Sequence, residues 1–267
     1  MADEWDAGTY ERVSEPQLEW GRRVVERIPV RGDERVLDAG CGTGRVTRVI
    51  AGRVPDGSVD AVDGSARMVE EARRRLADLA PRVSVRRQDL LELEVETPVD
   101  LIVSTATFHW ILDHDLLFAR LFAALAPGGR LVAQCGGAGN IARTLRVAEE
   151  VGAAAPYAEA LREMDAAHLF ADHVSTVTRL RDAGFEDATA WLEEAPAYFP
   201  DAGAGAEFLA AVVLRRHVPL LGPERGAAYC REVAEGLLEP DGRMVIDYVQ
   251  KAYLVAAGGV SADMSVR

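Results

Sequence analysis

The chain has 267 residues, of which 49% are hydrophobic and 27% charged, and its formal net charge is −13. These values are typical of a well-packed globular protein, and the excess of acidic residues argues against binding to nucleic acid or to an anionic membrane. The sequence has no apolar run long enough to span a membrane and no secretory signal in MADEWD, its first residues, so we expect a cytoplasmic protein, monomeric or homodimeric.

The first half of the chain alternates helical patterns with short apolar runs. Residues 11–28 form the first predicted helix, with one face made of Val13, Gln17, Trp20, Val24 and Ile28. The next predicted elements are strands at 36–37, 58–62, 83–85, 101–103 and 130–134, separated by helices at 45–54, after Ser65 and near Asp115. Strands that alternate with helices indicate a parallel sheet with helices on both faces. Such sheets bind ligands beyond the carboxyl ends of their strands.

The second half of the chain is less regular. Helix-rich segments at about 139–170 and 204–238 flank a helix-and-strand unit at 172–194. The apolar segment Met244–Ala256 is predicted to be the last strand. We expect the helix-rich segments to fold over the ligand end of the sheet as a cap. Residues 1–257 are then expected to form one domain, followed by a mobile tail at 258–267.

A glycine-rich loop, Asp38-Ala39-Gly40-Cys41-Gly42-Thr43-Gly44, joins the first strand of the sheet to the next helix. Glycines allow tight turns and let a ligand approach the backbone. A dinucleotide-binding loop has the pattern G-x-G-x-x-G and would need glycine where this chain has Arg45. The spacing G-x-G-x-G therefore favours a smaller ligand without a diphosphate over the nicotinamide cofactor of an oxidoreductase.

Acidic residues follow the second and third predicted strands. Asp63 ends the second strand, where a carboxylate can accept two hydrogen bonds from a ribose diol. Asp89 and Leu90 follow the third strand and suit the exocyclic amine and the ring of an adenine. Met68, in the first turn after Ser65, can cover the other face of that ring. These residues therefore match the two halves of an adenosine.

The glycine loop, Asp63-Gly64-Ser65, Asp89 and Leu125-Ala126-Pro127-Gly128-Gly129 occur in one order, and with them the chain resembles class I S-adenosylmethionine-dependent methyltransferases from about residue 5 to 257. The resemblance implies a doubly wound, Rossmann-like α/β sheet of seven strands, mostly parallel with the last antiparallel. It implies S-adenosylmethionine as cofactor and S-adenosylhomocysteine as product. The residues implied in cofactor binding are Tyr10, Trp20, Asp38, Gly40, Cys41, Gly42, Gly44, Asp63, Gly64, Met68, Asp89, Leu90, Ser104 and Thr105.

Three further segments are similar to the trans-aconitate 2-methyltransferase group of small-molecule carboxyl methyltransferases. They are the N-terminal segment with Trp5, Tyr10, Gln17 and Trp20, the segment Ser104–Trp110, and Asp247-Tyr248-Val249. In that group the N-terminal helix closes over the cofactor, and the aromatic pair after the fourth strand borders the substrate pocket. The resemblance implies substrate contacts from Gln17, His109, Trp110 and Tyr248. Relatives often carry an arginine just after Asp-Tyr-Val, where this chain has Gln250.

Methyl transfer from a sulfonium mainly requires alignment of the nucleophile with the methyl carbon. A carboxylate acceptor, which would give a methyl ester, is already nucleophilic at pH 7 and needs no general base. A nitrogen, oxygen or carbon acceptor of a natural product would need one, and His109 is then the candidate catalytic residue. The alternatives are a non-catalytic S-adenosylmethionine sensor and an enzyme of carrier-linked acids. The net charge disfavours the latter, because carrier proteins are also acidic.

The spacing of the remaining ionisable residues predicts no metal site. The expected substrate is a small molecule. Cys41, Cys135 and Cys230 are scattered, which fits a reducing cytoplasm, and no pair has metal-ligand spacing. The other histidines, taken as surface or structural residues, are His114, His168, His173 and His217. One or two arginines of the predicted cap can turn inward to meet an anionic substrate; the candidates are Arg143, Arg146, Arg162, Arg215 and Arg216.

Overall fold

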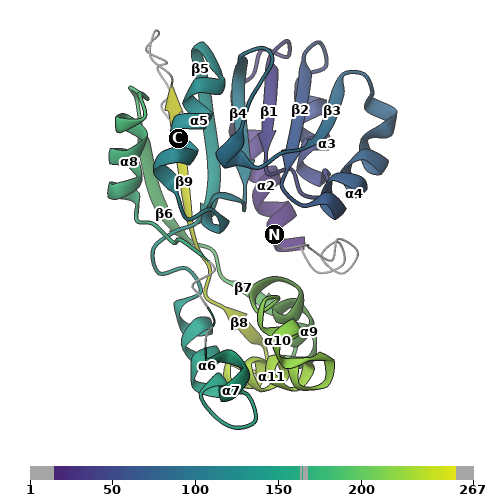
Figure 1. The fold of residues 1–267 in the computed structure, drawn as a ribbon, viewed down its shortest axis with the longest axis vertical. Coiled ribbons are helices and arrows are strands. Elements are labelled where there is room, and N and C mark those ends of the chain that lie inside the picture. Colours follow the sequence, from purple (N-terminus) through teal and green to yellow (C-terminus); the bar gives the residue numbers. More distant parts are fainter. Residues whose placement is uncertain (1–14, 163, 165–167, 257–267) are drawn as a thin grey trace.

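The computed structural model describes residues 15–162, 164 and 168–256. Its centre is a seven-stranded sheet in the order β3-β2-β1-β4-β5-β9-β6 (Figure 1). The strands are β1 (Arg35–Ala39), β2 (Ser58–Asp63), β3 (Val83–Arg87), β4 (Val99–Thr105), β5 (Leu125–Gly136), β6 (Thr189–Glu194) and β9 (Val249–Ala256). β1 to β5 are parallel, and β9 runs antiparallel between β5 and β6. The predicted α/β sheet with an antiparallel last strand is confirmed.

Helices cover both faces of this sheet because its central strands are apolar on both sides. The helices are α2 (Glu15–Arg27), α3 (Arg45–Arg53), α4 (Ala66–Leu76), α5 (His114–Ala124) and α8 (His173–Asp182). Val36 and Leu101 pack into the core under α2, α3 and α4. Leu37 and Ile102, their neighbours in sequence, pack into the core under α5 and α8. Successive residues thus bury opposite faces, as expected for a parallel sheet.

A separate helical layer lies beyond the carboxyl ends of the parallel strands (Figure 1). It contains α6 (Ala142–Gly152), α7 (Ala158–Leu161), α9 (Ala202–Phe208), a π-helical turn (Leu209–Val213), α10 (His217–Leu221), α11 (Pro223–Gly236) and a two-stranded sheet of β7 (Ala197–Phe199) and β8 (Met244–Ile246). The layer, here called the cap, has its own core with Phe208, Tyr229 and Val233. A packed cap forms a stable wall opposite the edge of the sheet.

The prediction of one final strand over Met244–Ala256 is wrong, because the strand is broken at Asp247 and Tyr248. β8 pairs with β7 in the cap, whereas β9 pairs with β5 and β6. The carboxylate of Asp247 accepts hydrogen bonds from the backbone N–H groups of Arg143 (2.7 Å) and Thr144 (3.0 Å). These groups begin α6 and have no partner within the helix. Because Asp247 caps α6, it takes no part in strand pairing. The expected tail at 258–267 lies outside the described residues.

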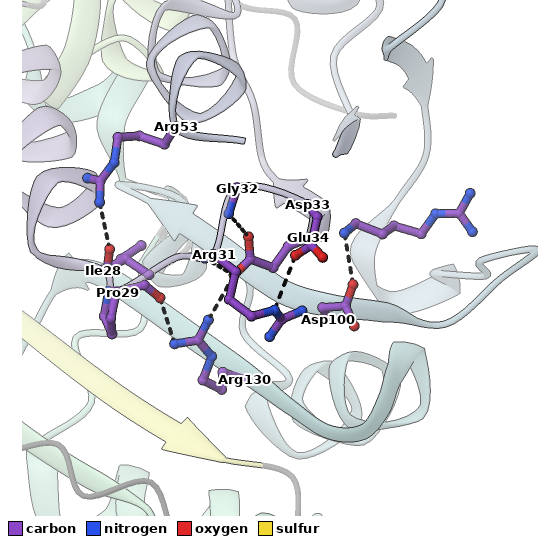
Figure 2. Close-up of polar contacts among 10 residues, drawn as sticks. Ile28, Pro29, Arg31, Gly32, Asp33, Glu34, Arg53, Asp100 and Arg130 are labelled. Atoms are coloured by element: carbon purple, nitrogen blue, oxygen red, sulfur yellow. Dashed lines mark hydrogen bonds and ion pairs between the residues drawn. The ribbon is translucent and has the colours of Figure 1, made fainter. Parts of the chain in front are cut away.

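At the amino ends of the central strands, a buried carboxylate ties the loop before β1 to β5 (Figure 2). Glu34 is fully buried and accepts hydrogen bonds from the backbone N–H groups of Arg31 (2.7 Å) and Gly32 (2.9 Å). Arg130 on β5 lies 3.7 Å from this carboxylate and donates to the carbonyl oxygen of Pro29 at 2.8 Å. Burial acts to raise the pKa of Glu34, but the backbone hydrogen bonds outweigh it and lower the pKa. The carboxylate therefore stays charged and fixes the path from α2 into the sheet.

Candidate active site

A cavity of about 1050 Å³ lies at the carboxyl ends of the strands, with residues of the sheet and of the cap in its wall. Most residues that the sequence assigns to binding meet here. Those that line the cavity are Trp20, Gly40, Gly42, Asp63, Gly64, Met68, Asp89, Leu90, Thr105, His109, Trp110 and Tyr248. Tyr10 and the side chain of Gln17 lie outside the described part of the chain. The four that do not line the cavity are Asp38, Cys41, Gly44 and Ser104.

The loop glycines have different roles. Gly40 has a φ of +90°, and a Cβ there would lie 2.2 Å from the Oγ1 of Thr107, so this position has no room for a side chain. Gly42 has a φ of +53°, and a Cβ there would meet nothing within 4 Å, so its backbone faces open space at the cavity. Gly44 (φ +79°) begins α3, and a Cβ there would lie 2.9 Å from Leu76. Gly42 is therefore the glycine that a ligand can approach.

Asp63 is held rigidly at the end of β2. Its Oδ2 accepts a hydrogen bond from the backbone N–H of Gly42, and its Oδ1 accepts one from Ser65, both at 2.9 Å. Asp63 also lines the cavity, and a carboxylate offers about four lone-pair positions in all. The same carboxylate therefore shapes the glycine loop and presents acceptor atoms to the cavity.

Asp38 and Ser104 support the loop from outside the cavity wall. Asp38 is buried, and its Oδ2 accepts a hydrogen bond from the hydroxyl of Thr47 at 2.6 Å. Burial, against the opposing effect of that hydrogen bond, raises the pKa of Asp38 to about 7, and the charge of Asp63 adds to the rise. The hydroxyl of Ser104 donates to the carbonyl oxygen of Ala39 at 2.6 Å. These contacts hold the backbone that leads into the loop.

Asp89, Leu90 and Met68 bring an acidic group and two apolar side chains to the cavity. Asp89 caps the 3-10 turn Leu90–Glu92, because its Oδ1 accepts a hydrogen bond from the backbone N–H of Leu91 at 2.9 Å. Met68 lies in the first turn of α4, whose predicted cap, Ser65, accepts its backbone N–H. The local structure thus fixes the positions of all three side chains through capped turns.

His109 lines the cavity, and one backbone hydrogen bond determines which of its ring nitrogens carries the proton. The backbone N–H of Gly136 donates to its Nδ1 at 3.2 Å. Burial lowers the pKa of His109 to about 3, and the positive charges of His168, Lys251 and His114 lower it further. The ring is therefore neutral at pH 7. Because Nδ1 accepts, the proton is on Nε2.

Aromatic rings form the rest of the wall. The ring of Trp20 on α2 lies 4.9 Å from that of Tyr248, which joins the N-terminal helix to the link between β8 and β9. Trp110 lies 4.4 Å from His168, which stacks on Phe170 at 5.0 Å. His168 is one of the histidines that the sequence assigned a structural role, and it lines the cavity instead. His168 lies between α7 and α8, and no residue spacing in the sequence marks it as part of a site.

Two of the five candidate cap arginines reach this cavity, Arg215 and Arg216. The guanidinium of Arg215 lies 4.6 Å from the centre of the Trp110 ring. Arg143 pairs instead with Glu239 at 2.6 Å. Burial, followed by the charges of Arg215 and Arg216, lowers the pKa of His168 to about 4. The cap therefore places positive charge beside the aromatic wall.

Two further properties concern the described part of the chain. Its helices include none that is both long and apolar enough to cross a membrane. Within the same ranges, His, Cys, Asp and Glu side chains form no group of three or more that could hold a metal ion.

Comparisons with known proteins bear on the same region. A family model described as "Methyltransferase domain" matches residues 36–129. The chain is 31% identical to a trans-aconitate 2-methyltransferase of Methylobacterium radiotolerans over 271 aligned residues, which cover 96% of this chain and 98% of that protein. It is 32% identical to a trans-aconitate 2-methyltransferase of Methylobacterium nodulans over 196 residues, 73% of this chain and 69% of that one.

Solved structures share the fold at lower identity. The YcgJ protein of Bacillus subtilis aligns with a TM-score of 0.63 at 13% identity, over 91% of this chain and 100% of that one. A phosphoethanolamine N-methyltransferase of Haemonchus contortus, in complex with phosphomonomethylethanolamine and S-adenosylhomocysteine, aligns with a TM-score of 0.61 at 19% identity, over 95% of this chain and 57% of that one. At these identities the likeness concerns the fold alone.

Proposed function

The chain belongs to the class I S-adenosylmethionine-dependent methyltransferases, and from that premise we propose that it methylates a carboxylate of a small organic acid to give a methyl ester. The observation that carries the choice of acceptor is the hydrogen bond from the Gly136 N–H to Nδ1 of His109. That bond leaves His109 a donor toward the cavity. A carboxylate can accept a hydrogen bond from this donor, and it needs no base.

The residues around the glycine loop fit the cofactor. The backbone at Gly42 faces open space, and Asp63 brings to the same cavity a carboxylate, a group that accepts hydrogen bonds from a ribose diol. Asp89, Leu90 and Met68 line the same cavity, which supports a role for Asp89 as acceptor of the adenine amine and for the two apolar side chains as contacts of the ring. S-adenosylmethionine supplies a methyl group on a cationic sulfur, which leaves as a neutral thioether. The chain's own residues then have to bind, orient and exclude water.

The acceptor side of the cavity suits an anion. The Nε2–H of His109 can hold one carboxylate oxygen, while Arg215 and Arg216 add positive charge from the cap. This local charge offsets the negative field of the chain for an anionic substrate. Alignment of a carboxylate with the methyl group, away from water, can lower the barrier by on the order of 7–11 kcal/mol. The names of the two similar Methylobacterium proteins also describe an enzyme of a carboxylic acid.

The alternative in which His109 acts as a general base for a nitrogen, oxygen or carbon acceptor is less well supported. A base needs a free lone pair, and the lone pair of Nδ1 already receives the Gly136 N–H. With its pKa lowered to about 3 by burial, the ring is also a weak base.

The test combines product analysis with one substitution. The protein is incubated with S-adenosylmethionine labelled in the methyl carbon and with a panel of di- and tricarboxylic acids and fatty acids. We expect the label in an ester that mild alkali hydrolyses. His109→Ala should lower kcat/KM by only about tenfold, the effect of one lost hydrogen bond, and His109→Gln, which keeps an N–H donor, by less. Label on nitrogen or carbon, or a loss of several orders of magnitude in His109→Ala, would contradict the proposal.

A further inference from the structure

Two buried glutamines in the cavity wall have unused hydrogen-bonding atoms. Gln134 on β5 is 5% exposed and Gln250 on β9 is 9% exposed, and both line the cavity. Within the described residues, the Oε1 of Gln134 and the Nε2 of Gln250 are buried without any hydrogen-bond partner. Buried polar groups are nearly always paired in folded proteins. Two such glutamine atoms in the wall of one cavity therefore indicate positions that a ligand completes.

The register of the sheet places the two amides on the same face, next to His109. In the β5–β9 ladder Gln134 is opposite Ala252, and Gly136 is opposite Gln250. Gln134 and Gln250 are thus diagonal neighbours, within reach of one another's long side chains. Gly136 is also the residue whose N–H holds His109. The two glutamines, here called the amide pair, therefore belong to the acceptor side of the cavity.

Two polar residues close to Gln250, Lys251 and Asn140, have hydrogen-bond partners of their own. The next residue, Lys251, is fully buried on the opposite face of the sheet, where its Nζ donates to the hydroxyl of Thr176 at 2.8 Å. Asn140 also lines the cavity, but its Oδ1 already accepts the backbone N–H of Val249 at 2.8 Å. Lys251 therefore makes its hydrogen bond on the far face of the sheet from the pair, and Asn140 is uncharged.

We propose that the amide pair recognises a hydroxyl or a primary amide of the acceptor, which is then a hydroxy acid or an amide-bearing acid. Gln134 offers an acceptor and Gln250 a donor, and a hydroxyl or an amide satisfies both atoms. A carboxylate satisfies only Gln250, an ammonium only Gln134, and a methyl group neither. The inference rests on the proposed carboxylate methylation and concerns the group that lies away from the methylated carboxylate.

The first experiment measures kcat/KM for straight-chain acids of four to eight carbons that end in a methyl, hydroxyl, primary amide, carboxylate or ammonium group. At equal length, we expect hydroxyl- or amide-ended acids to exceed the other three by roughly 100-fold or more, because a site built around a polar group strongly rejects analogues that lack it. Equal values, or a preference for the carboxylate-ended acids, would overturn the inference and leave carboxylate methylation intact. If protein that still binds S-adenosylhomocysteine forms no ester with any acid of the panel, the proposed function is overturned as well.

The second experiment separates recognition from a structural role. Gln134→Met and Gln250→Met are close in shape and remove the unpaired atoms. We expect the Tm of the unliganded protein to stay or rise, since a buried unpaired group is removed, while the preference for hydroxyl-ended acids falls about tenfold or more in each variant. Gln88→Met is the control and should keep the wild-type preference, because this half-buried glutamine lies outside the cavity, where its Nε2 donates to the carbonyl oxygen of Glu92 and its Oε1 accepts from Arg86. A lower Tm with equal losses on every acid would show a structural role and overturn the proposal.

Discussion

Buried polar groups at the two edges of the sheet differ in whether they have hydrogen-bond partners within the protein. At the amino edge the carboxylate of Glu34 has two backbone donors and the guanidinium of Arg130 (Figure 2). At the carboxyl edge Gln134 and Gln250 keep buried atoms without partners, and the backbone of Gly42 faces open space. Among the described residues, the buried carboxylate at the amino edge is paired within the protein, whereas the two glutamine atoms at the carboxyl edge are those that we propose a ligand completes.

This difference assigns stability and binding to separate places on one scaffold. A satisfied buried network stabilises the fold, whereas unpaired polar atoms cost stability and persist where function uses them. Substitutions at the amino edge should therefore change the free energy of unfolding and leave affinity unchanged. Substitutions at the carboxyl edge should change the affinity for ligands, and their effect on the free energy of unfolding should be smaller than at the amino edge.

The largest expected effect is at the amino edge. Glu34→Ala leaves Arg130 and two backbone N–H groups without their buried partner, and we expect a loss of about 3–5 kcal/mol in the free energy of unfolding, measured with urea. Asp33→Ala removes only the exposed ion pair with Arg31 at 3.1 Å and should cost under about 1 kcal/mol. The affinity for S-adenosylhomocysteine should be unchanged in both. A tenfold weaker affinity in folded Glu34→Ala would break the separation of the two edges.

At the carboxyl edge, Asp63→Ala should weaken S-adenosylhomocysteine binding by about 100-fold or more in calorimetry, because charge-assisted hydrogen bonds contribute roughly 1.5–3 kcal/mol each. Asp63→Asn keeps one acceptor oxygen and should lie between this variant and the wild type. Asp60→Asn is the matched control on the same strand, since its carboxylate accepts the hydroxyl of Ser84 at 2.7 Å and does not line the cavity. Equal affinity in Asp63→Ala and the wild type would remove Asp63 from the binding site.

Acid should weaken the fold through the cavity wall. Burial lowers the pKa of His109 to about 3 and that of His168 to about 4, below the value of about 6.5 expected in the unfolded chain. The unfolded state therefore binds more protons below pH 6.5, so stability is full above that pH and falls as pH decreases toward 4. Each histidine can contribute at most about 1.4 kcal/mol per pH unit. Urea unfolding at several pH values should show a shallower decline in His109→Gln, and an identical decline would contradict the buried neutral ring.

The smallest effect comes from one methyl group. Gly42→Ala places a Cβ in open space at a φ of +53°, which costs roughly 1–2 kcal/mol of stability and intrudes where the ligand approaches. We expect roughly tenfold weaker S-adenosylhomocysteine binding, about 1.4 kcal/mol. Gly128→Ala, at a φ of +75° with nothing within 4 Å and outside the cavity, carries the same backbone strain. It should lose similar stability but no affinity.

Much of the fold and of the cofactor side could be predicted from the sequence because the signals are local. The apolar runs predicted the parallel strands, and the glycine loop, Asp63 and Asp89 were expected at their carboxyl ends, where Gly42 and the two carboxylates line the cavity. The break at Asp247 could not be predicted, since the apolar segment around it has no glycine or proline. Its cause is the N-terminus of α6, which lies about a hundred residues earlier in the chain.

The acceptor side was harder to predict because its properties come from partners distant in sequence. Nothing in the sequence around His109 shows that the backbone N–H of Gly136 donates a hydrogen bond to its Nδ1. That hydrogen bond determines which ring nitrogen carries the proton. Gln250 stood out only as a difference from relatives, and Gln134 not at all. Their shared property, an unpaired atom in one cavity, depends on the register between β5 and β9. His168 and Arg215 also line the cavity, but both lie outside the short sequence motifs that marked the cofactor side.

The most direct test of the open edge is a crystal structure of the protein with S-adenosylhomocysteine. We expect the ribose hydroxyls within hydrogen-bond distance of the Asp63 carboxylate, the adenine amine beside Asp89, and the ligand in contact with the backbone of Gly42. A ligand bound elsewhere, or these two carboxylates turned to solvent in the complex, would contradict it.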